Sequence, residues 1–116
     1  NKKQINKLSR LAKSLGLEVL IEIHDLSELD NCCIDSIDII GVNNRNLKTF
    51  NVDIETSISL SSKIPSNYVK ISESGISNPN DIITLKNVGY DGFLIGENFM
   101  KKEDPVSACN DFIKKI

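Results

Sequence analysis

The stretch from Ile37 to Arg45 reads IDIIGVNNR, an apolar segment that ends in three polar residues. A short apolar run rich in β-branched residues is typical of a strand in a parallel sheet, where helices cover the strand. We therefore expect a strand over Ile37–Val42, with the polar residues just beyond its end. The same pattern predicts further strands at 17–24 (LEVLIEIH), 68–72 (YVKIS) and 93–96 (FLIG).

Helical patterns separate these strands. Apolar residues recur at helical spacing from Ile5 to Leu15, and Gly16 is suited to the position just after the helix end. Asp25 can cap a short second helix, with Glu28 three residues later in the capping-box position. A third helix is predicted over 52–63. Two more helix starts carry a cap residue followed by proline: Asn78-Pro79 and Asp104-Pro105.

The predicted order is α-β-α-β-α-β-α-β-α, with five helices, four strands and no hairpin signal between strands. Strands joined only through helices must pair in parallel with right-handed crossovers. The order therefore predicts an α/β fold, either a small doubly wound sheet or part of a (β/α)8 barrel. A length of 116 residues suits a single domain over residues 1–116.

Composition excludes several classes of function. The net charge of −2 argues against nucleic acid or an anionic membrane recruited by bulk charge. No apolar run approaches the ~18 residues of a membrane span. Three cysteines without a Cys-x-x-Cys spacing predict neither a disulfide framework nor a zinc site, and they favour the reducing cytoplasm. We also expect the adjacent Cys32 and Cys33 to be structural thiols rather than nucleophiles.

Each predicted strand ends in polar residues. Because the carboxyl ends of parallel strands share one rim, and ligands bind at that rim, four strand ends point to one site. The clusters are Glu22 with His24, Asn43-Asn44-Arg45, Glu73-Ser74-Gly75 and Gly96-Glu97-Asn98.

Within these clusters, Glu22 lies between apolar neighbours, where a lone buried carboxylate is costly. It is either a general acid or base with a raised pKa or the partner of a lysine or arginine. His24 is expected to be a structural hydrogen-bonding residue rather than a catalyst. Arg45 either binds a phosphate or carboxylate or ties down its loop. The two glycine-containing loops resemble anion sites, and in the second the N–H of Glu97 would bind rather than its side chain.

Four segments resemble indole-3-glycerol phosphate synthase, in the same order and with suitable spacing. They are Val19–Asp25 (VLIEIHD), Ile40–Phe50 (IGVNNRNLKTF), Ser72–Ile76 (SESGI) and Leu94–Met100 (LIGENFM). The Asn-Asn-Arg loop is the most specific of these, because Ser-Gly-Ile and Leu-Ile-Gly recur in other phosphate-binding barrels. The resemblance runs from about residue 15 to the end of the chain.

The resemblance implies a (β/α)8 barrel of tryptophan biosynthesis. That family converts 1-(2-carboxyphenylamino)-1-deoxyribulose 5-phosphate to indole-3-glycerol phosphate, releasing carbon dioxide and water, without a metal or organic cofactor. By resemblance, the catalytic residues are Glu22, Asn43, Glu73 and Ser74. Likewise, the residues implied to bind the phosphorylated substrate are Arg45, Gly75, Leu94, Gly96 and Glu97, with Leu94 near the aromatic ring.

The resemblance is incomplete. The family's catalytic lysines on strands one and three, and its strand-one glutamate, have no counterpart here. A full barrel takes about 250 residues, and the four predicted strands match strands five to eight. We therefore expect the C-terminal half of such an enzyme, inactive alone and dependent on a missing N-terminal half.

Two alternatives remain. The first is a non-catalytic half-barrel that binds phosphorylated ligands and closes its open sheet edges by self-association. The second is a sister barrel such as phosphoribosylanthranilate isomerase, which would need a catalytic cysteine on the first strand and a later aspartate. Neither residue pattern of that isomerase is present.

Overall fold

Each apolar run of the sequence forms a strand, and each strand is followed by a helix, in the computed structural model, which describes residues 1–116. The strands are β1 (Leu20–Ile23), β2 (Ile39–Asn43), β3 (Val69–Glu73) and β4 (Gly92–Leu94). The helices are α1 (Lys2–Ser14), α2 (Leu26–Leu29), α3 (Glu55–Ser61), α4 (Pro79–Asn87), α5 (Glu97–Met100) and α6 (Pro105–Ile113).

The four strands form one sheet in the order β1-β2-β3-β4, and all three pairings are parallel. Neighbouring strands in the sheet are therefore also neighbours in the sequence, joined each time through helical segments. This confirms the predicted α/β class and the predicted absence of hairpins.

Asp25, Asn78 and Asp104 cap their helices as predicted, but the Glu28 side chain makes no reciprocal bond to the Asp25 amide and instead lies 3.6 Å from His24 Nδ1. Asp25 accepts a hydrogen bond from the Glu28 amide at 3.1 Å, and Asn78 accepts one from the Asn80 amide at 2.9 Å. Asp104 caps α6 by accepting from Ser107 N at 3.1 Å. These bonds satisfy amide groups that the first helical turn leaves without partners.

Element boundaries differ from the sequence expectation. β1 is confined to Leu20–Ile23 and α3 begins at Glu55, because the flanking residues lack the strand partners or helical bonds that would extend them. Val52, expected in a helix, forms an isolated antiparallel bridge with Arg45. A short helix that was not predicted, α5, follows β4, so the chain has six helices instead of five.

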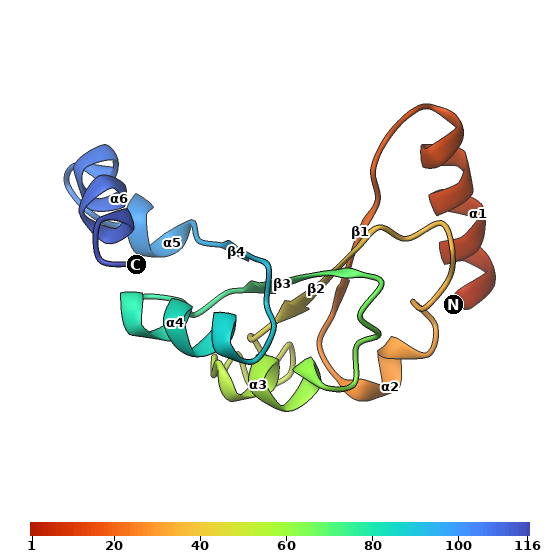
Figure 1. Cartoon of the computed structure of the whole chain (residues 1–116), viewed down its shortest axis with the longest axis horizontal. Coiled ribbons are helices and arrows are strands. Elements are labelled where there is room, and N and C mark those ends of the chain that lie inside the picture. Colours follow the sequence, from red (N-terminus) through yellow and green to blue (C-terminus); the bar gives the residue numbers. More distant parts are fainter.

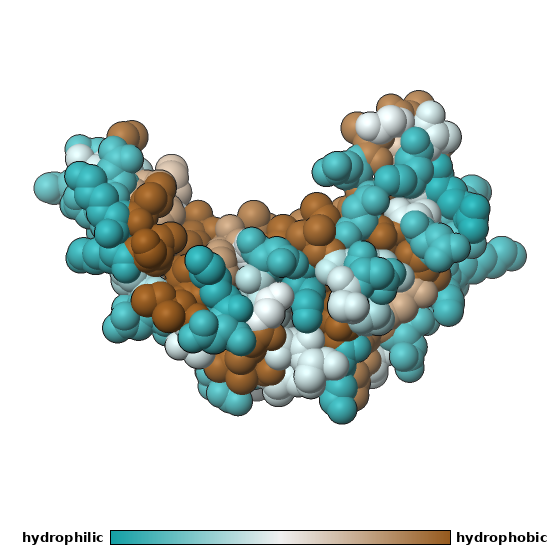
Figure 2. All heavy atoms as spheres, in the orientation of Figure 1, coloured by the Kyte–Doolittle hydropathy of each residue, from teal (hydrophilic) through white to brown (hydrophobic).

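The two faces of the sheet differ. Helices α2, α3 and α4 lie against one face, while α1 and the pair α5–α6 stand at opposite ends of the sheet (Figure 1). The core lies on the helix-covered side and includes Ile23, Ile40, Val42 and Leu85, which are almost fully buried. The opposite face lies in the hollow of the molecule, with hydrophobic residues along its floor (Figure 2).

Helix α1 turns much of its apolar side away from the core. Leu8 and Leu11 are exposed, as is Leu15 just after the helix end, and Ser9 is the buried residue of this helix. Helical spacing in the sequence identified the helix but not the face that packs. None of the helices combines the length and the apolar character needed to cross a membrane.

The core assignment predicts a sharp contrast within α4. Leu85→Ala should lower the free energy of unfolding by about 2–5 kcal/mol, because it leaves a cavity in a fully buried position. Ile83→Ala on the same helix removes a similar side chain from an exposed position and should lower it by less than about 1 kcal/mol. Urea unfolding of both variants measures the difference, and equal losses would contradict this core.

Candidate active site at the carboxyl ends of the strands

Three of the predicted site residues form one row across the sheet. Asn43 on β2 pairs with Glu73 on β3, and Glu73 pairs with Leu94 on β4. Because side chains alternate along a strand, residues that pair directly project from the same face. The row lies at the carboxyl ends of the three strands, where the sequence predicted a common rim.

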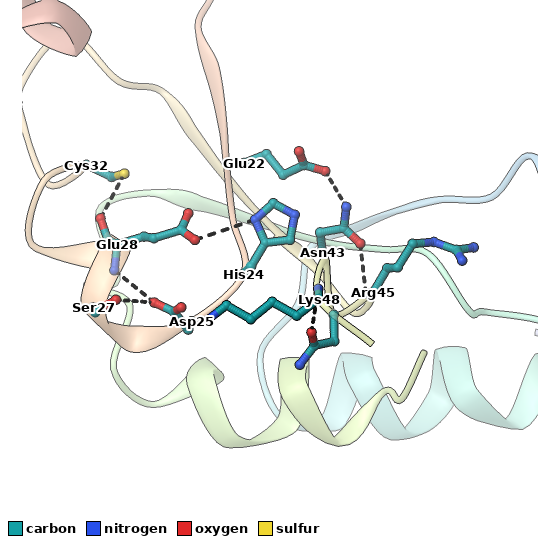
Figure 3. A network of polar contacts seen from close by, with 10 residues as sticks. Glu22, His24, Asp25, Ser27, Glu28, Cys32, Asn43, Arg45 and Lys48 are labelled. Atoms are coloured by element: carbon teal, nitrogen blue, oxygen red, sulfur yellow. Dashed lines mark hydrogen bonds and ion pairs between the residues drawn. The ribbon is translucent and has the colours of Figure 1, made fainter. Parts of the chain in front are cut away.

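Asn43 joins β1 to this row. Its side-chain nitrogen donates to Glu22 Oε1 at 2.6 Å, and its side-chain oxygen accepts from the Arg45 amide at 2.9 Å. Figure 3 shows the Asn43 amide between Glu22 and Arg45, bonded on both sides. The bond from Arg45 to the side-chain oxygen of Asn43 leaves the side-chain nitrogen facing Glu22. Asn43 is therefore the donor that orients the Glu22 carboxylate.

The side chains of Glu22 and Glu73 approach each other over Gly41, which has no side chain to separate them. Glu22 pairs with Gly41, and a Cβ added at Gly41 would lie 3.0 Å from Glu73 Oε2. The Glu73 side chain therefore lies over the glycine and reaches toward Glu22 on the next strand. Without a side chain, Gly41 lets two carboxyl groups from β1 and β3 meet across β2.

The two carboxyl groups differ in protonation. Glu73 is only 8% exposed, and burial together with the neighbouring Glu22 carboxylate raises the pKa of Glu73 to about 8. A hydrogen bond from Glu73, supported by the one from Asn43, holds the pKa of Glu22 below its usual range. At neutral pH the pair therefore holds a proton on Glu73 and a charge on Glu22, as expected for facing carboxyl groups.

The sequence predicted either a raised pKa or a basic partner for Glu22, and neither is found. Helices cover one face of its strand, but Glu22 projects from the other face and is exposed. Its partners are Asn43 and the protonated Glu73, and its pKa is lowered. The raised pKa belongs to Glu73, because that carboxyl group is the buried member of the pair.

A cavity of about 770 Å³ opens beside the row, between the ends of β3 and β4. Seven predicted site residues line it: Arg45, Glu73, Ser74, Gly75, Leu94, Gly96 and Glu97. Glu22 and Asn43 are not in its lining. Asn43 instead lines a smaller neighbouring cavity of about 300 Å³, together with His24 and Arg45.

The turn after β3 has a special backbone. Ser74 and Gly75 both adopt the left-handed conformation with φ near +71°. A side chain is excluded at Gly75 for two reasons. The positive φ disfavours any residue with a Cβ, and a Cβ at this position would overlap the Val52 side chain. Val52 belongs to the bridge with Arg45, so the loop after β2 packs onto the turn after β3.

The cavity contains opposing charges. The Arg45 guanidinium lies 3.5 Å from the Glu97 carboxylate, whose side chain is 81% exposed. Lys101 also lines the cavity, a cation that the sequence reading missed because it follows α5 rather than a strand. The arrangement supplies two cations and a glycine turn at one place, which is the composition of an anion site.

His24 is not bonded as expected. Its Nδ1 lies 3.6 Å from Glu28 Oε1, and its Nε2 is buried without a hydrogen-bond partner (Figure 3). The cysteines Cys32, Cys33 and Cys109 are all free thiols. No group of three or more histidine, cysteine, aspartate or glutamate side chains is arranged to hold a metal ion.

A buried network that was not predicted from the sequence lies just behind the rim. Asn44, Ser57 and Ser72 hydrogen-bond to one another, and Tyr90 donates to the Ser57 carbonyl oxygen at 2.6 Å. One signal of this network is present in the sequence, the second asparagine of the Asn43-Asn44 pair.

Comparison with known proteins agrees with this geometry. The family model for indole-3-glycerol phosphate synthase matches residues 1–112. The indole-3-glycerol phosphate synthase of Thermoanaerobacter sp. (strain X514) is 51% identical over 105 residues, which cover 90% of this chain and 40% of the relative. The indole-3-glycerol phosphate synthase of Bacteroides thetaiotaomicron (strain ATCC 29148) is 47% identical over 110 residues, which cover 95% of this chain and 42% of the relative. The chain thus spans about 40% of the length of these relatives.

Two solved structures share the fold at low identity. The Amycolatopsis orientalis BexX/CysO complex matches with a TM-score of 0.69 and 14% identity, over 99% of this chain and 48% of that one. A native KDPGal structure matches with a TM-score of 0.60 and 13% identity, over 98% of this chain and 66% of that one. Together with the parallel sheet and the longer relatives, these matches confirm the predicted fold class, part of a (β/α)8 barrel.

The carboxyl pair predicts a pH-dependent stability. Between the ordinary glutamate pKa and about 8, the folded protein keeps a proton on Glu73 that the unfolded chain has released. The free energy of unfolding should therefore fall as pH rises through this window and level off above it. Glu73→Gln should remove this decrease of the unfolding free energy with pH. Glu18→Gln, at an exposed position, should retain the decrease.

Carbon-detected NMR titration checks the same pair directly. Glu22→Gln should lower the pKa of Glu73 from about 8, yet leave it above the ordinary value because burial is the larger cause. A Glu73 pKa that does not respond to Glu22→Gln would contradict the pairing.

Proposed function

This chain belongs to the indole-3-glycerol phosphate synthase family, and from that premise we propose that it forms strands five to eight of the barrel and one side of the active site. The reaction is the conversion of 1-(2-carboxyphenylamino)-1-deoxyribulose 5-phosphate to indole-3-glycerol phosphate in tryptophan biosynthesis. The observation that carries the proposal is the facing pair Glu22 and Glu73 at the strand ends, beside the cavity that contains Arg45.

The carboxyl pair suits the proton transfers of this reaction. Loss of water from the closed ring needs one proton given to the leaving hydroxyl group and one removed from a neighbouring atom of the substrate. A protonated Glu73 and an ionised Glu22 supply a donor and an acceptor at the same place. In this proposal Asn43 orients Glu22, and Ser74 faces the substrate.

The cavity suits the substrate's phosphate and its aromatic ring. The glycines Gly75 and Gly96 let backbone N–H groups approach an anion, and Glu97 would contribute its N–H. Arg45 would exchange the exposed Glu97 carboxylate for the phosphate, which offers more acceptor oxygens and more charge. Leu94, half exposed at the cavity edge, would pack against the ring.

Turnover requires groups from outside these four strands. The family's catalytic lysines on strands one and three have no counterpart in the chain, so we propose that it acts only when the rest of a barrel closes the sheet. The free thiols of Cys32, Cys33 and Cys109 fit a reducing compartment, and we propose the cytoplasm.

A second candidate function is a non-catalytic half-barrel that binds phosphorylated ligands and pairs with a second copy. The observation that favours it is apolar surface at both ends of the sheet. Leu8, Leu11 and Leu20 are exposed at the β1 end, and Leu94, Met100 and Val106 at the β4 end. Such patches mark surfaces that another chain or another part of the same chain covers.

A chimeric enzyme tests the catalytic proposal. This chain replaces the 105 matched residues of the Thermoanaerobacter relative, which contributes the remaining strands. The chimera should form indole-3-glycerol phosphate, and Glu73→Gln should lower kcat by about 10²–10⁴ because it removes a proton donor. Glu18→Gln, remote from the strand carboxyl ends, is the matched control and should leave kcat unchanged. A folded but inactive chimera, or an active Glu73→Gln chimera, would reject the proposal.

Light scattering on the 116-residue chain separates the two candidate functions. A monodisperse dimer that binds inorganic phosphate would favour the self-associating half-barrel. Paired with an N-terminal segment of the relative, the enzyme fragment should instead form a one-to-one complex, and a persistent homodimer in that mixture would count against it.

A further inference from the structure

Asn44 is buried directly behind the rim, and all of its polar groups are bonded. The residue is 2% exposed. Its main-chain N–H donates to Glu73 O at 2.9 Å, and its main-chain oxygen accepts from Asp53 N at 3.1 Å. Its side-chain nitrogen donates to Ser72 Oγ at 3.1 Å and to the Ser74 carbonyl oxygen at 3.0 Å.

The other end of the carboxamide is held by helix α3. The Asn44 side-chain oxygen accepts from the Ser57 amide at 3.1 Å and from Ser57 Oγ at 2.7 Å. These two donors require an acceptor, so the nitrogen of the amide must face Ser74. The orientation of the Asn44 side chain is therefore set by α3 before any ligand binds.

The bond to Ser74 has a consequence for the next residue. The peptide between Ser74 and Gly75 is planar and trans, so its C=O and N–H point in opposite directions. Asn44 holds the carbonyl of this peptide inward, toward the buried network. The N–H of Gly75 consequently points away from the network, and Gly75 lines the 770 Å³ cavity.

Ser74 needs such a restraint. A serine at φ near +71° is strained, because side chains with a Cβ disfavour the left-handed region. The turn has no helix or strand bonds of its own at this point, since β3 ends at Glu73. The Asn44 side chain is thus a specific contact that stabilises one orientation of the Ser74–Gly75 peptide over the flipped one.

We propose that Asn44 is a positioning residue, which aims the Gly75 N–H into the cavity for the phosphate group of the substrate. This inference rests on the proposed function, because it assumes that the cavity binds phosphate. The side chain of Asn44 bonds to Ser57, Ser72 and the Ser74 carbonyl, and to neither carboxyl group of the Glu22–Glu73 pair, so its role is in substrate binding and not in proton transfer.

The decisive variant is Asn44→Asp. Aspartate keeps the shape and the acceptor for Ser57 but presents an oxygen, not a donor, to the Ser74 carbonyl oxygen, which favours the flipped peptide. The matched control is Ser57→Ala. It removes the Ser57 Oγ bonds to Asn44 and Ser72, but the Ser57 main-chain amide still donates to the Asn44 side-chain oxygen, so the amide nitrogen of Asn44 still faces Ser74.

Inorganic phosphate is the probe, titrated against the 116-residue chain and followed by the amide NMR signals of Gly75 and Gly96. Asn44→Asp should weaken binding about tenfold, equivalent to about 1.4 kcal/mol, while Ser57→Ala should bind as the unsubstituted chain does. In the active chimera, Asn44→Asp should raise KM by a similar factor with kcat within about twofold. Urea unfolding should show that both variants are destabilised.

Outcomes for the two proposals are distinct. Lack of phosphate binding by the unsubstituted chain would overturn the proposed phosphate site and this inference with it. Normal phosphate binding by Asn44→Asp, or equal weakening by Ser57→Ala, would overturn the inference alone. A loss confined to kcat would do the same.

A measurement on the unsubstituted chain covers the case in which Asn44→Asp does not fold. Phosphate held by the Gly75 N–H should lock the Ser74 carbonyl onto Asn44, and hydrogen exchange of the Asn44 side-chain amide should slow by about tenfold at saturation. The Asn78 side-chain amide, which belongs to a helix cap away from this network, is the internal reference. Unchanged exchange at Asn44 with phosphate bound would overturn the inference.

Discussion

Parallel pairing in one register is the constraint on which the candidate site depends. It aligns Asn43, Glu73 and Leu94 in a row and brings Glu22 opposite Gly41, so that residues separated by up to 72 positions share one face. A slip of one residue in β3 would turn Glu73 toward the helices, since side chains alternate along a strand. Gly41 adds a second condition, because only an absent side chain lets the Glu73 carboxyl group cross β2 to Glu22.

The two faces of the sheet have different roles: one packs the apolar core, and the other carries the candidate site. Ile23, Ile40 and Val42 are packed under the helices and supply the apolar burial that stabilises the fold. The opposite face carries Glu22 and Glu73 in a setting where one carboxyl group is buried and the other is exposed. That difference in burial, together with the donor from Asn43, decides which carboxyl group keeps the proton.

Local signals in the sequence were sufficient for part of this arrangement. The caps at Asp25, Asn78 and Asp104 and the alternation of strands and helices were predictable, because each depends on residues a few positions apart. The same is true of the four clusters at the strand ends. The pKa assignment to Glu22 failed because it depended on which face the helices cover, and on Glu73, 51 positions away. Strand ends failed for a similar reason, since a strand extends only as far as its neighbours pair with it.

Asn43 and Asn44 show how much of a residue's role can be predicted from a sequence motif when the pairing of the strands is not known. They are chemically identical neighbours, yet the period of two in a strand sends their side chains to opposite faces. Asn43 meets a carboxylate on the open face and donates to it, while Asn44 enters the buried face and holds the Ser74 carbonyl. The residue type alone fits both positions, because each needs a donor and an acceptor in one rigid group. Only the register of β2 against β3 separates the asparagine that serves the carboxyl pair from the one that shapes the turn beside it.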